Sequence, residues 1–312
     1  MVIVNPVSGS GTKDGLSQRL GTVMRAAGYE FTLIYTRSAG HATELARRAV
    51  DEDYHAVIAC GGDGTVNETA RALCGTRVIL GIIPSGSGNG LARHLGIPTD
   101  FEQALDIITH GHVINADYAL ANGRPFFCTF GVGYDAVVSH KFAKNGHRGM
   151  MKYFKCAVSE YAKYKPETYA ISANGKILTQ EALLVACCNA SQWGNNAYIA
   201  PTASVQDGLL DVVIVHRGSL MESMLLGVDL FTGYIDKNTQ ITTFKAPSAV
   251  IYRGHDGPAH IDGEPIELGD IIEVKCRHKG LRIYAPEEQK FQPILTPAWN
   301  IFFSLRRFFT KE

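Results

Sequence analysis

Hydrophobic residues in the first third of the chain alternate between strand-like runs and helix-like spacing. Short apolar runs rich in β-branched residues predict strands at residues 1–5, 31–35, 55–60 and 78–83. Between these runs, apolar residues recur at helical intervals over residues 14–27, 42–50, 66–73 and 91–95. Strands that alternate with helices imply right-handed crossovers, so this part of the chain predicts an α/β unit with a parallel sheet.

The pattern changes near Asp117, where strand-like runs begin to outnumber helices. Strands are predicted at residues 126–130, 168–172, 182–187, 209–215, 249–252, 271–276 and 281–284. Several connections contain Asn-Gly or Asp-Gly, the turn dipeptides of β structure, and helices are predicted only at 134–143 and 150–164. We therefore predict an α/β domain over residues 1–118 and a strand-rich domain over residues 119–285.

Composition limits the class of protein. A length of 312 residues agrees with about two domains, and 46% hydrophobic with 19% charged residues excludes disorder. Thirty basic residues balance thirty acidic ones, which argues against a dedicated nucleic-acid binder. The seven cysteines are irregularly spaced, and the apolar stretch 220–235 is interrupted by Glu222 and Asp229. We expect a cytoplasmic protein that is soluble or lies on a membrane surface.

Three glycine-rich turns follow predicted strands at one edge of the parallel sheet. They are residues 5–9, residues 61–65 and residues 85–89. Ligands of such sheets bind beyond the carboxyl ends of the strands, and glycine lets backbone N–H groups approach a phosphate closely. No P-loop and no protein-kinase lysine motif is present. Together the three turns predict a nucleotide phosphate site of a different kind.

Two further features of the sequence have more than one interpretation. Asp63 lies among the backbone amides of the second turn. Its carboxylate can bind a metal, accept a proton, or hold the loop by hydrogen bonds to its backbone. Residues 131–136 match a dinucleotide fingerprint, but no clean βαβ unit surrounds them. We interpret this second motif as a tight turn at the domain boundary.

Six sequence blocks match one family in order and span nearly the whole chain. They are NPVSG at 5–9, GGDGTVNE at 61–68, PSGSGNGLAR at 84–93, FGVGYDA at 130–136, QDGLLDV at 206–212 and IDGE at 261–264. With these blocks the chain resembles the diacylglycerol kinase catalytic-domain superfamily, which includes soluble bacterial lipid kinases and eukaryotic sphingosine and ceramide kinases. The resemblance implies an α/β nucleotide-binding domain, a β-sandwich-like lipid domain and a cleft between them.

The resemblance also implies site residues. ATP would be held by Asn5, Pro6, Val7, Ser8, Gly9, Thr36, Gly61, Gly62, Asp63, Gly64, Thr65, Val66, Asn67 and Ser87. A Mg²⁺ ion of structural type would be held by Ser204, Asp207 and the carbonyl of Leu209. Asp262 matches the catalytic base of bacterial relatives, with Glu264 beside it, whereas some eukaryotic relatives are argued to use the aspartate that matches Asp63.

The function implied is transfer of the γ-phosphoryl group of ATP to the hydroxyl of a membrane lipid alcohol. The third turn reads GSGNG at residues 86–90, which is more similar to the sphingosine and ceramide kinases than to many bacterial relatives. The acceptor can therefore be diacylglycerol or a sphingoid or ceramide-type lipid. Two alternatives remain, a kinase of soluble NAD that shares the GGDGT block and a non-catalytic nucleotide-binding regulator.

The end of the chain has its own pattern. Thr296 and Pro297 are typical of the start of a helix, and residues 297–311 predict a helix with one aromatic face and basic flanks. Such a helix suits the inner face of a membrane, and the alternatives are a dimer contact or packing of residues 286–312 back onto the first domain.

Overall fold

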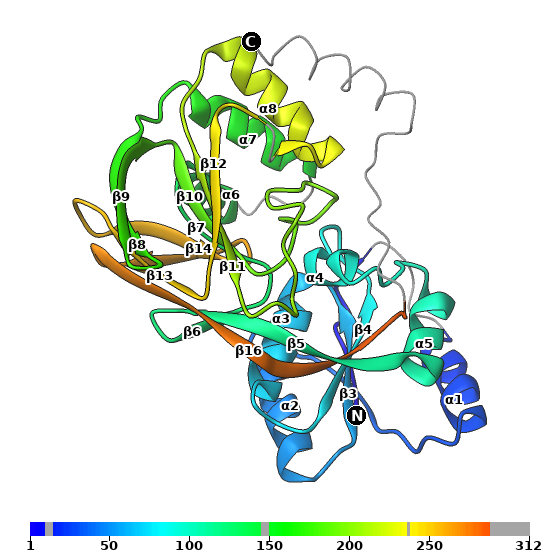
Figure 1. Cartoon of the computed structure of the whole chain (residues 1–312). Helices are drawn as coiled ribbons and strands as arrows, with labels where there is room; N and C mark the ends of the chain where they lie inside the picture. The colour runs from blue at the N-terminus through cyan, green and yellow to red at the C-terminus, as the bar shows by residue number, and fades with distance from the viewer. Residues whose placement is uncertain (10–14, 145–149, 236–237, 288–312) are drawn as a thin grey trace.

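The computed structural model describes residues 1–9, 15–144, 150–235 and 238–287 (Figure 1). Most of the predicted tail, residues 288–312, lies outside the described residues. The helices are α1 Leu16–Ala26, α2 His41–Asp51, α3 Asp63–Leu73, α4 Gly90–His94, α5 Phe101–His110, α6 Tyr134–Lys144, α7 Met150–Tyr161 and α8 Leu220–Thr232. Of the helices in these ranges, none is long and apolar enough to cross a membrane.

The larger sheet begins with a parallel core. Its strands are β2 Leu33–Tyr35, β1 Val2–Val4, β3 Ala56–Gly61, β4 Ile79–Pro84, β16 Ile271–Ala285, β13 Ser248–Tyr252, β8 Glu167–Ala173 and β9 Lys176–Ala182, in that spatial order. Strands β5 His112–Ala121 and β6 Arg124–Phe126 extend it, with β5 paired to β16. The pairs β2–β1, β1–β3 and β3–β4 are parallel, and β16 joins β4 in parallel through Ile283 and Leu80.

Helices cover both faces of this parallel core. The strands β1, β3 and β4 are buried along their whole length, which explains their continuous apolar runs. One face packs against α1 and α5 through residues such as Leu20 and Ile108, and the other against α2, α3 and α4 through residues such as Leu45 and Leu91. This arrangement confirms the predicted α/β part of the fold.

A second, antiparallel sheet lies in the other half of the molecule. Its order is β12 Ile241–Ala246, β11 Leu210–Val215, β10 Leu184–Cys188, β7 Thr129–Gly133, β14 Gly257–Ile261 and β15 Glu264–Leu268. Alternate residues of this sheet pack against β5, β8, β13 and β16 of the first sheet to form one buried core. The two layers form the sandwich-like unit that the resemblance implies, and α6, α7 and α8 lie on its outer side (Figure 1).

Some elements differ from the prediction. The runs predicted at 271–276 and 281–284 belong to one strand, β16, with a register shift between Arg277 and Leu281. The sequence pattern does not predict α5, α8, β5, β6, β9, β12, β14 or β15. The domain boundaries at residues 118 and 285 stay predictions, since β5 and β16 pair with each other as they pass along both halves.

Candidate functional site

The three glycine-rich turns meet at the carboxyl edge of the parallel strands. The Asn5 side-chain amide donates to Thr65 Oγ1 at 3.0 Å, which links the first turn to the second. The Ser8 and Ser85 hydroxyls lie 2.8 Å apart and link the first turn to the third. The structure therefore brings together three segments that are separated by dozens of residues in the chain.

The third turn touches both of the others through its backbone. A Cβ atom added to Gly86 would lie 2.6 Å from the Cα atom of Gly62. One added to Gly9, whose φ is +78°, would lie 2.6 Å from the carbonyl oxygen of Ser85. Only glycine allows this approach, so these residues are required for the loops to meet.

Asp63 braces the third turn. Its carboxylate accepts hydrogen bonds from the backbone N–H groups of Asn89, at 2.8 Å, and Gly90, at 2.7 Å. Helix α4 begins at Gly90, so the carboxylate also satisfies N–H groups that a helix start leaves without intrahelical partners. Of the two interpretations in the sequence analysis, this geometry favours the loop-bracing one.

The other residues predicted to contact the nucleotide lie around the same edge of the sheet, and their side chains differ in how far they are exposed to solvent. Thr36 follows β2 and donates its N–H to the carbonyl of Val4 at 2.8 Å, beside the first turn. Pro6, Val7 and Ser87 are exposed. Val66 is buried in the core behind the loops, so its side chain is not available to a ligand.

A pocket of about 270 Å³ lies between the two halves of the molecule. Its lining residues are Gly64, Asn67, Glu68 and Arg71 from α3, and Asp262, Gly263 and Glu264 from the turn between β14 and β15. The first group spans two turns of helix α3 and the second forms an Asp-Gly hairpin. The predicted nucleotide loop and the predicted base therefore face the same cavity.

Asp262 is held tightly in this pocket. Its carboxylate accepts hydrogen bonds from the backbone N–H groups of Phe127 at 2.9 Å, Cys128 at 2.7 Å and Thr129 at 2.9 Å. Burial raises the pKa of Asp262 above its ordinary value, although the three N–H groups oppose this effect. A carboxylate offers about four lone-pair positions, so one remains for a substrate proton.

A buried pair of side chains supports the turn that carries Asp262. His260 Nε2 lies 2.9 Å from the carboxylate of Asp135, and both side chains are at least 95% buried. The Gly263 N–H points to His260 Nδ1 at 3.3 Å, and Ser139 donates to the Gly263 carbonyl at 2.6 Å. A Cβ on Gly131 would collide with Asp135 and His260. This explains why the first position of the motif at 131–136 is a glycine.

Arg71 is a pocket residue that the sequence analysis missed. Its guanidinium forms an ion pair with Glu264 at 2.8 Å and crosses from α3 to the Asp262 turn. Gly64, Asn67, Glu68 and Arg71 share one face of α3 by helical spacing. That spacing, counted forward from the GGDGT block, is the signal that could have identified Arg71.

The residues predicted to hold Mg²⁺ lie in the loop before β11, and they do not fit a divalent ion as they are placed. The Ser204 hydroxyl accepts from Gln206 N–H, and Asp207 Oδ1 accepts from Leu209 N–H. Asp207 Oδ2 is 2.8 Å from the Lys245 ammonium. A dication beside that ammonium would be repelled, and Mg²⁺ requires near-octahedral oxygens at about 2.1 Å. Within the described ranges, no group of three His, Cys, Asp or Glu residues is arranged to hold a metal.

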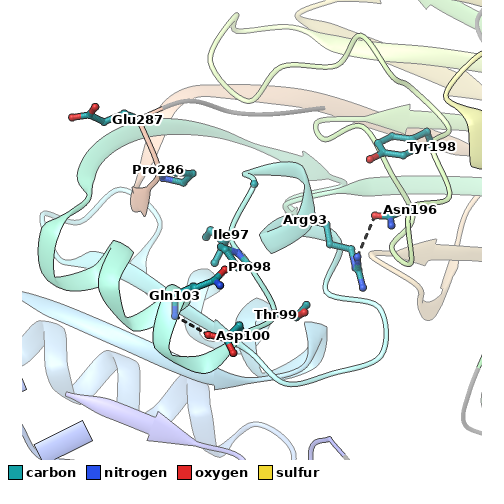
Figure 2. Close-up of a pocket in the computed structure, with 11 residues that line it drawn as sticks. Arg93, Ile97, Pro98, Thr99, Asp100, Gln103, Asn196, Tyr198, Pro286 and Glu287 are labelled. Atoms are coloured by element: carbon teal, nitrogen blue, oxygen red, sulfur yellow. Dashed lines mark hydrogen bonds between the residues drawn. The ribbon is translucent and has the colours of Figure 1, made fainter. Parts of the chain in front are cut away.

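A larger cavity, about 660 Å³, lies beside the third turn and helices α4 and α5 (Figure 2). Figure 2 shows Arg93 reaching across to Asn196, whose side-chain oxygen accepts a hydrogen bond at 3.2 Å. Arg93 also donates to the carbonyl of Gly88 at 3.0 Å. Arg93 therefore holds the third turn to the loop that contains Asn196, and the two bonds use its Nε and Nη1 atoms.

Comparison with known proteins gives a consistent result over nearly the whole chain. The family model for the diacylglycerol kinase catalytic domain matches residues 1–121, and the YegS C-terminal NAD kinase beta sandwich-like domain matches residues 128–284. A diacylglycerol kinase of Bacillus subtilis (strain 168) is 29% identical over 305 residues, which cover 93% of this chain and 97% of that protein.

Solved structures agree with these matches. A protein of Bacillus anthracis str. Sterne, assigned as a diacylglycerol kinase, superimposes with a TM-score of 0.74 at 26% identity and covers 92% of this chain and 97% of its own. An NAD kinase of Archaeoglobus fulgidus in complex with ATP gives a TM-score of 0.53 at 12% identity, covering 98% of each chain. The second likeness concerns the fold alone.

Proposed function

Because the chain belongs to the diacylglycerol kinase catalytic-domain family, we propose that it is an ATP-dependent lipid kinase. The observation that carries the proposal is the pocket between the two halves. One wall is α3, which starts in the GGDGT turn, and the other is the turn that carries Asp262. A nucleotide bound on the glycine-rich turns would point its terminal phosphate toward that carboxylate.

In the proposed reaction, the hydroxyl oxygen of the lipid attacks the γ-phosphorus of ATP. The new O–P bond replaces the bond to the β-phosphate oxygen, ADP leaves, and Asp262 accepts the hydroxyl proton. Such transfers depend mainly on positioning and on neutralising charge. Arg71 is placed to contribute positive charge, and the backbone N–H groups of the turns would cradle the phosphates. Mg²⁺ carried by ATP would supply further charge neutralisation.

We assign the role of base to Asp262 and a positioning role to Asp63. The carboxylate of Asp63 is directed at the start of α4 by two short hydrogen bonds, while Asp262 lines the pocket itself. A raised pKa also makes Asp262 a stronger proton acceptor than an ordinary aspartate. Glu264 lies beside it and holds Arg71 in the pocket.

For the acceptor we propose diacylglycerol, presented at a membrane surface. Several similar proteins that cover most of this chain are named diacylglycerol kinase, which supports this lipid over sphingosine or ceramide. The resemblance of the third turn to sphingosine kinases concerns the phosphate site and not the lipid.

The test is phosphoryl transfer from γ-labelled ATP with Mg²⁺ to separate acceptors in mixed micelles. The acceptors are diacylglycerol, monoacylglycerol, ceramide and sphingosine, with NAD as a soluble control. We expect label in phosphatidic acid. Label in phosphorylated ceramide or sphingosine would change the acceptor, label in NADP alone would overturn the lipid kinase, and ATP binding without any transfer would favour a regulator.

A further inference from the structure

The loop before β11 contains an internal cation at the place where the sequence resemblance implies a structural metal ion. Lys245 lies on β12, directly opposite Asp211 of β11 in the antiparallel register. Its ammonium donates to Asp207 Oδ2 at 2.8 Å and to the carbonyl of Thr202 at 3.0 Å. It also lies 3.2 Å from Asp211 Oδ2. The ammonium thus makes two hydrogen bonds and one further ion-pair contact, with three different residues.

The Asp211 carboxylate requires a cation in this position. Its side chain is 4% exposed, and its Oδ1 accepts a hydrogen bond from the Thr202 hydroxyl at 3.1 Å. A buried carboxylate is costly unless it is paired, and Lys245 supplies the charge. Because the two residues are cross-strand neighbours, strand pairing itself fixes the ammonium beside the carboxylate.

The same loop is fixed on its other side without a metal. Asp117 of β5 is buried, and its carboxylate accepts the Gly208 N–H at 2.6 Å. That carboxylate also accepts the Lys279 N–H at 2.6 Å and is 2.9 Å from His278 Nδ1. The loop is thus anchored to β12 through Lys245 and to β5 and β16 through Asp117.

We propose that the Lys245 ammonium replaces a structural divalent cation in this chain. It joins Thr202, Asp207 and Asp211 through their oxygens, as a bound ion would, and both oxygens of Asp207 are already engaged, Oδ1 by the Leu209 N–H and Oδ2 by the ammonium. The fold of the second half is then independent of divalent cations. The proposal does not concern Mg²⁺ bound to ATP, because the loop before β11 and the pocket between α3 and Asp262 share no residue.

The experiment measures thermal unfolding of the full chain without nucleotide, in EDTA and in millimolar Mg²⁺. The wild type is expected to have the same midpoint in both. Lys245→Met, which keeps an unbranched apolar stem one atom shorter and removes the charge, is expected to lower the midpoint in EDTA by roughly 5 °C or more. Lys176→Met, at an exposed lysine of β9, is the matched control and is expected to match the wild type.

Two results would overturn the proposal. One is an unfolding midpoint of the wild type that is several degrees higher in Mg²⁺ than in EDTA, together with no such difference in Asp207→Asn. The loop would then bind the metal despite Lys245. The other is a Lys245→Met variant as stable as Lys176→Met. The wild-type comparison needs no variant to fold, and neither readout depends on kinase activity, so failure of the proposed function would leave this test intact.

Discussion

Two aspartates lie near the nucleotide loops, and their hydrogen-bond partners distinguish them. Asp63 accepts two backbone N–H groups at the start of a short helix and so fixes the third turn. Asp262 accepts three backbone N–H groups from residues 127–129 and also lines the pocket. Cys128 lies between them, and burial with both negative charges raises the pKa of its thiol well above the ordinary value, so it stays neutral.

The assignment of Asp63 as a positioning residue is tested by Asp63→Asn. The amide retains one acceptor and loses the second together with the charge, so we expect a loss of about 1–2 kcal/mol of stability and weaker ATP binding. Turnover at saturating ATP should fall by no more than about tenfold. Unchanged stability and ATP affinity with turnover reduced more than about a hundredfold would instead identify Asp63 as the base.

His94 predicts a pH-dependent contribution to stability. It lies on α4, where its Nδ1 accepts the Ser191 N–H at 3.1 Å, and burial lowers its pKa from 6.5 to about 4. The unfolded chain therefore binds a proton between these values while the folded chain does not, so stability falls as the pH falls. From pH 7 to pH 5 the loss attributable to His94 is about 2 kcal/mol.

The measurement is urea unfolding of the wild type and His94→Asn at both pH values. The asparagine can accept the Ser191 N–H but does not titrate, so the variant should lose about 2 kcal/mol less than the wild type on acidification. His112→Asn, at an exposed histidine at the start of β5, serves as the control and should lose as much stability on acidification as the wild type. An equal loss in wild type and His94→Asn would refute the assignment.

At the scale of elements, the close approach of two glycine-rich turns shapes the nucleotide edge. We expect Gly86→Ala to separate the second and third turns, because the new Cβ would meet the backbone of Gly62 at 2.6 Å. The strain should cost about 1–3 kcal/mol and reduce ATP affinity at least about tenfold, measured by calorimetric titration.

A glycine in open space provides the comparison. Gly227 lies in the middle of α8, and an added Cβ there would meet nothing within 4 Å. Gly227→Ala should leave ATP affinity unchanged and raise stability by up to about 1 kcal/mol. If both variants bind ATP like the wild type, the contact between the turns is not required for the site.

The sequence predicted the elements whose pattern is strong, and missed those that depend on partners. Strands β1, β3 and β4 are fully buried, so their apolar runs are unambiguous. Helix α8 lacks a clear polar face, although its capping box of Ser219 and Glu222 was a usable signal. The edge-like strands β9 and β15 carry mixed residues and are recognisable only beside the strands with which they pair.

At the scale of the whole molecule, the pocket depends on contacts between distant parts of the chain. Arg71 and Glu264 are separated by 193 positions, and the three N–H groups that hold Asp262 lie more than 130 positions before it. The sequence motifs contain most of the residues that line the pocket. No local sequence pattern, however, predicts that α3 lies opposite the β14–β15 turn. That placement follows from β16, which joins the antiparallel layers to the parallel core.

The most direct test of the proposed lipid kinase activity and of Asp262 as its base is the rate of phosphoryl transfer from γ-labelled ATP to diacylglycerol in mixed micelles. The rate is measured for the wild type and for Asp262→Asn. Asp256→Asn is the matched control, since Asp256 also precedes a glycine, in the connection before β14, but is exposed and lies outside the pocket.

We predict that Asp262→Asn lowers turnover by about 10²–10⁴-fold while ATP affinity changes by less than roughly threefold, and that Asp256→Asn matches the wild type. Turnover of Asp262→Asn within about tenfold of the wild type would contradict the assignment of Asp262 as the base. An absence of transfer by the wild type to diacylglycerol would contradict the proposed function itself.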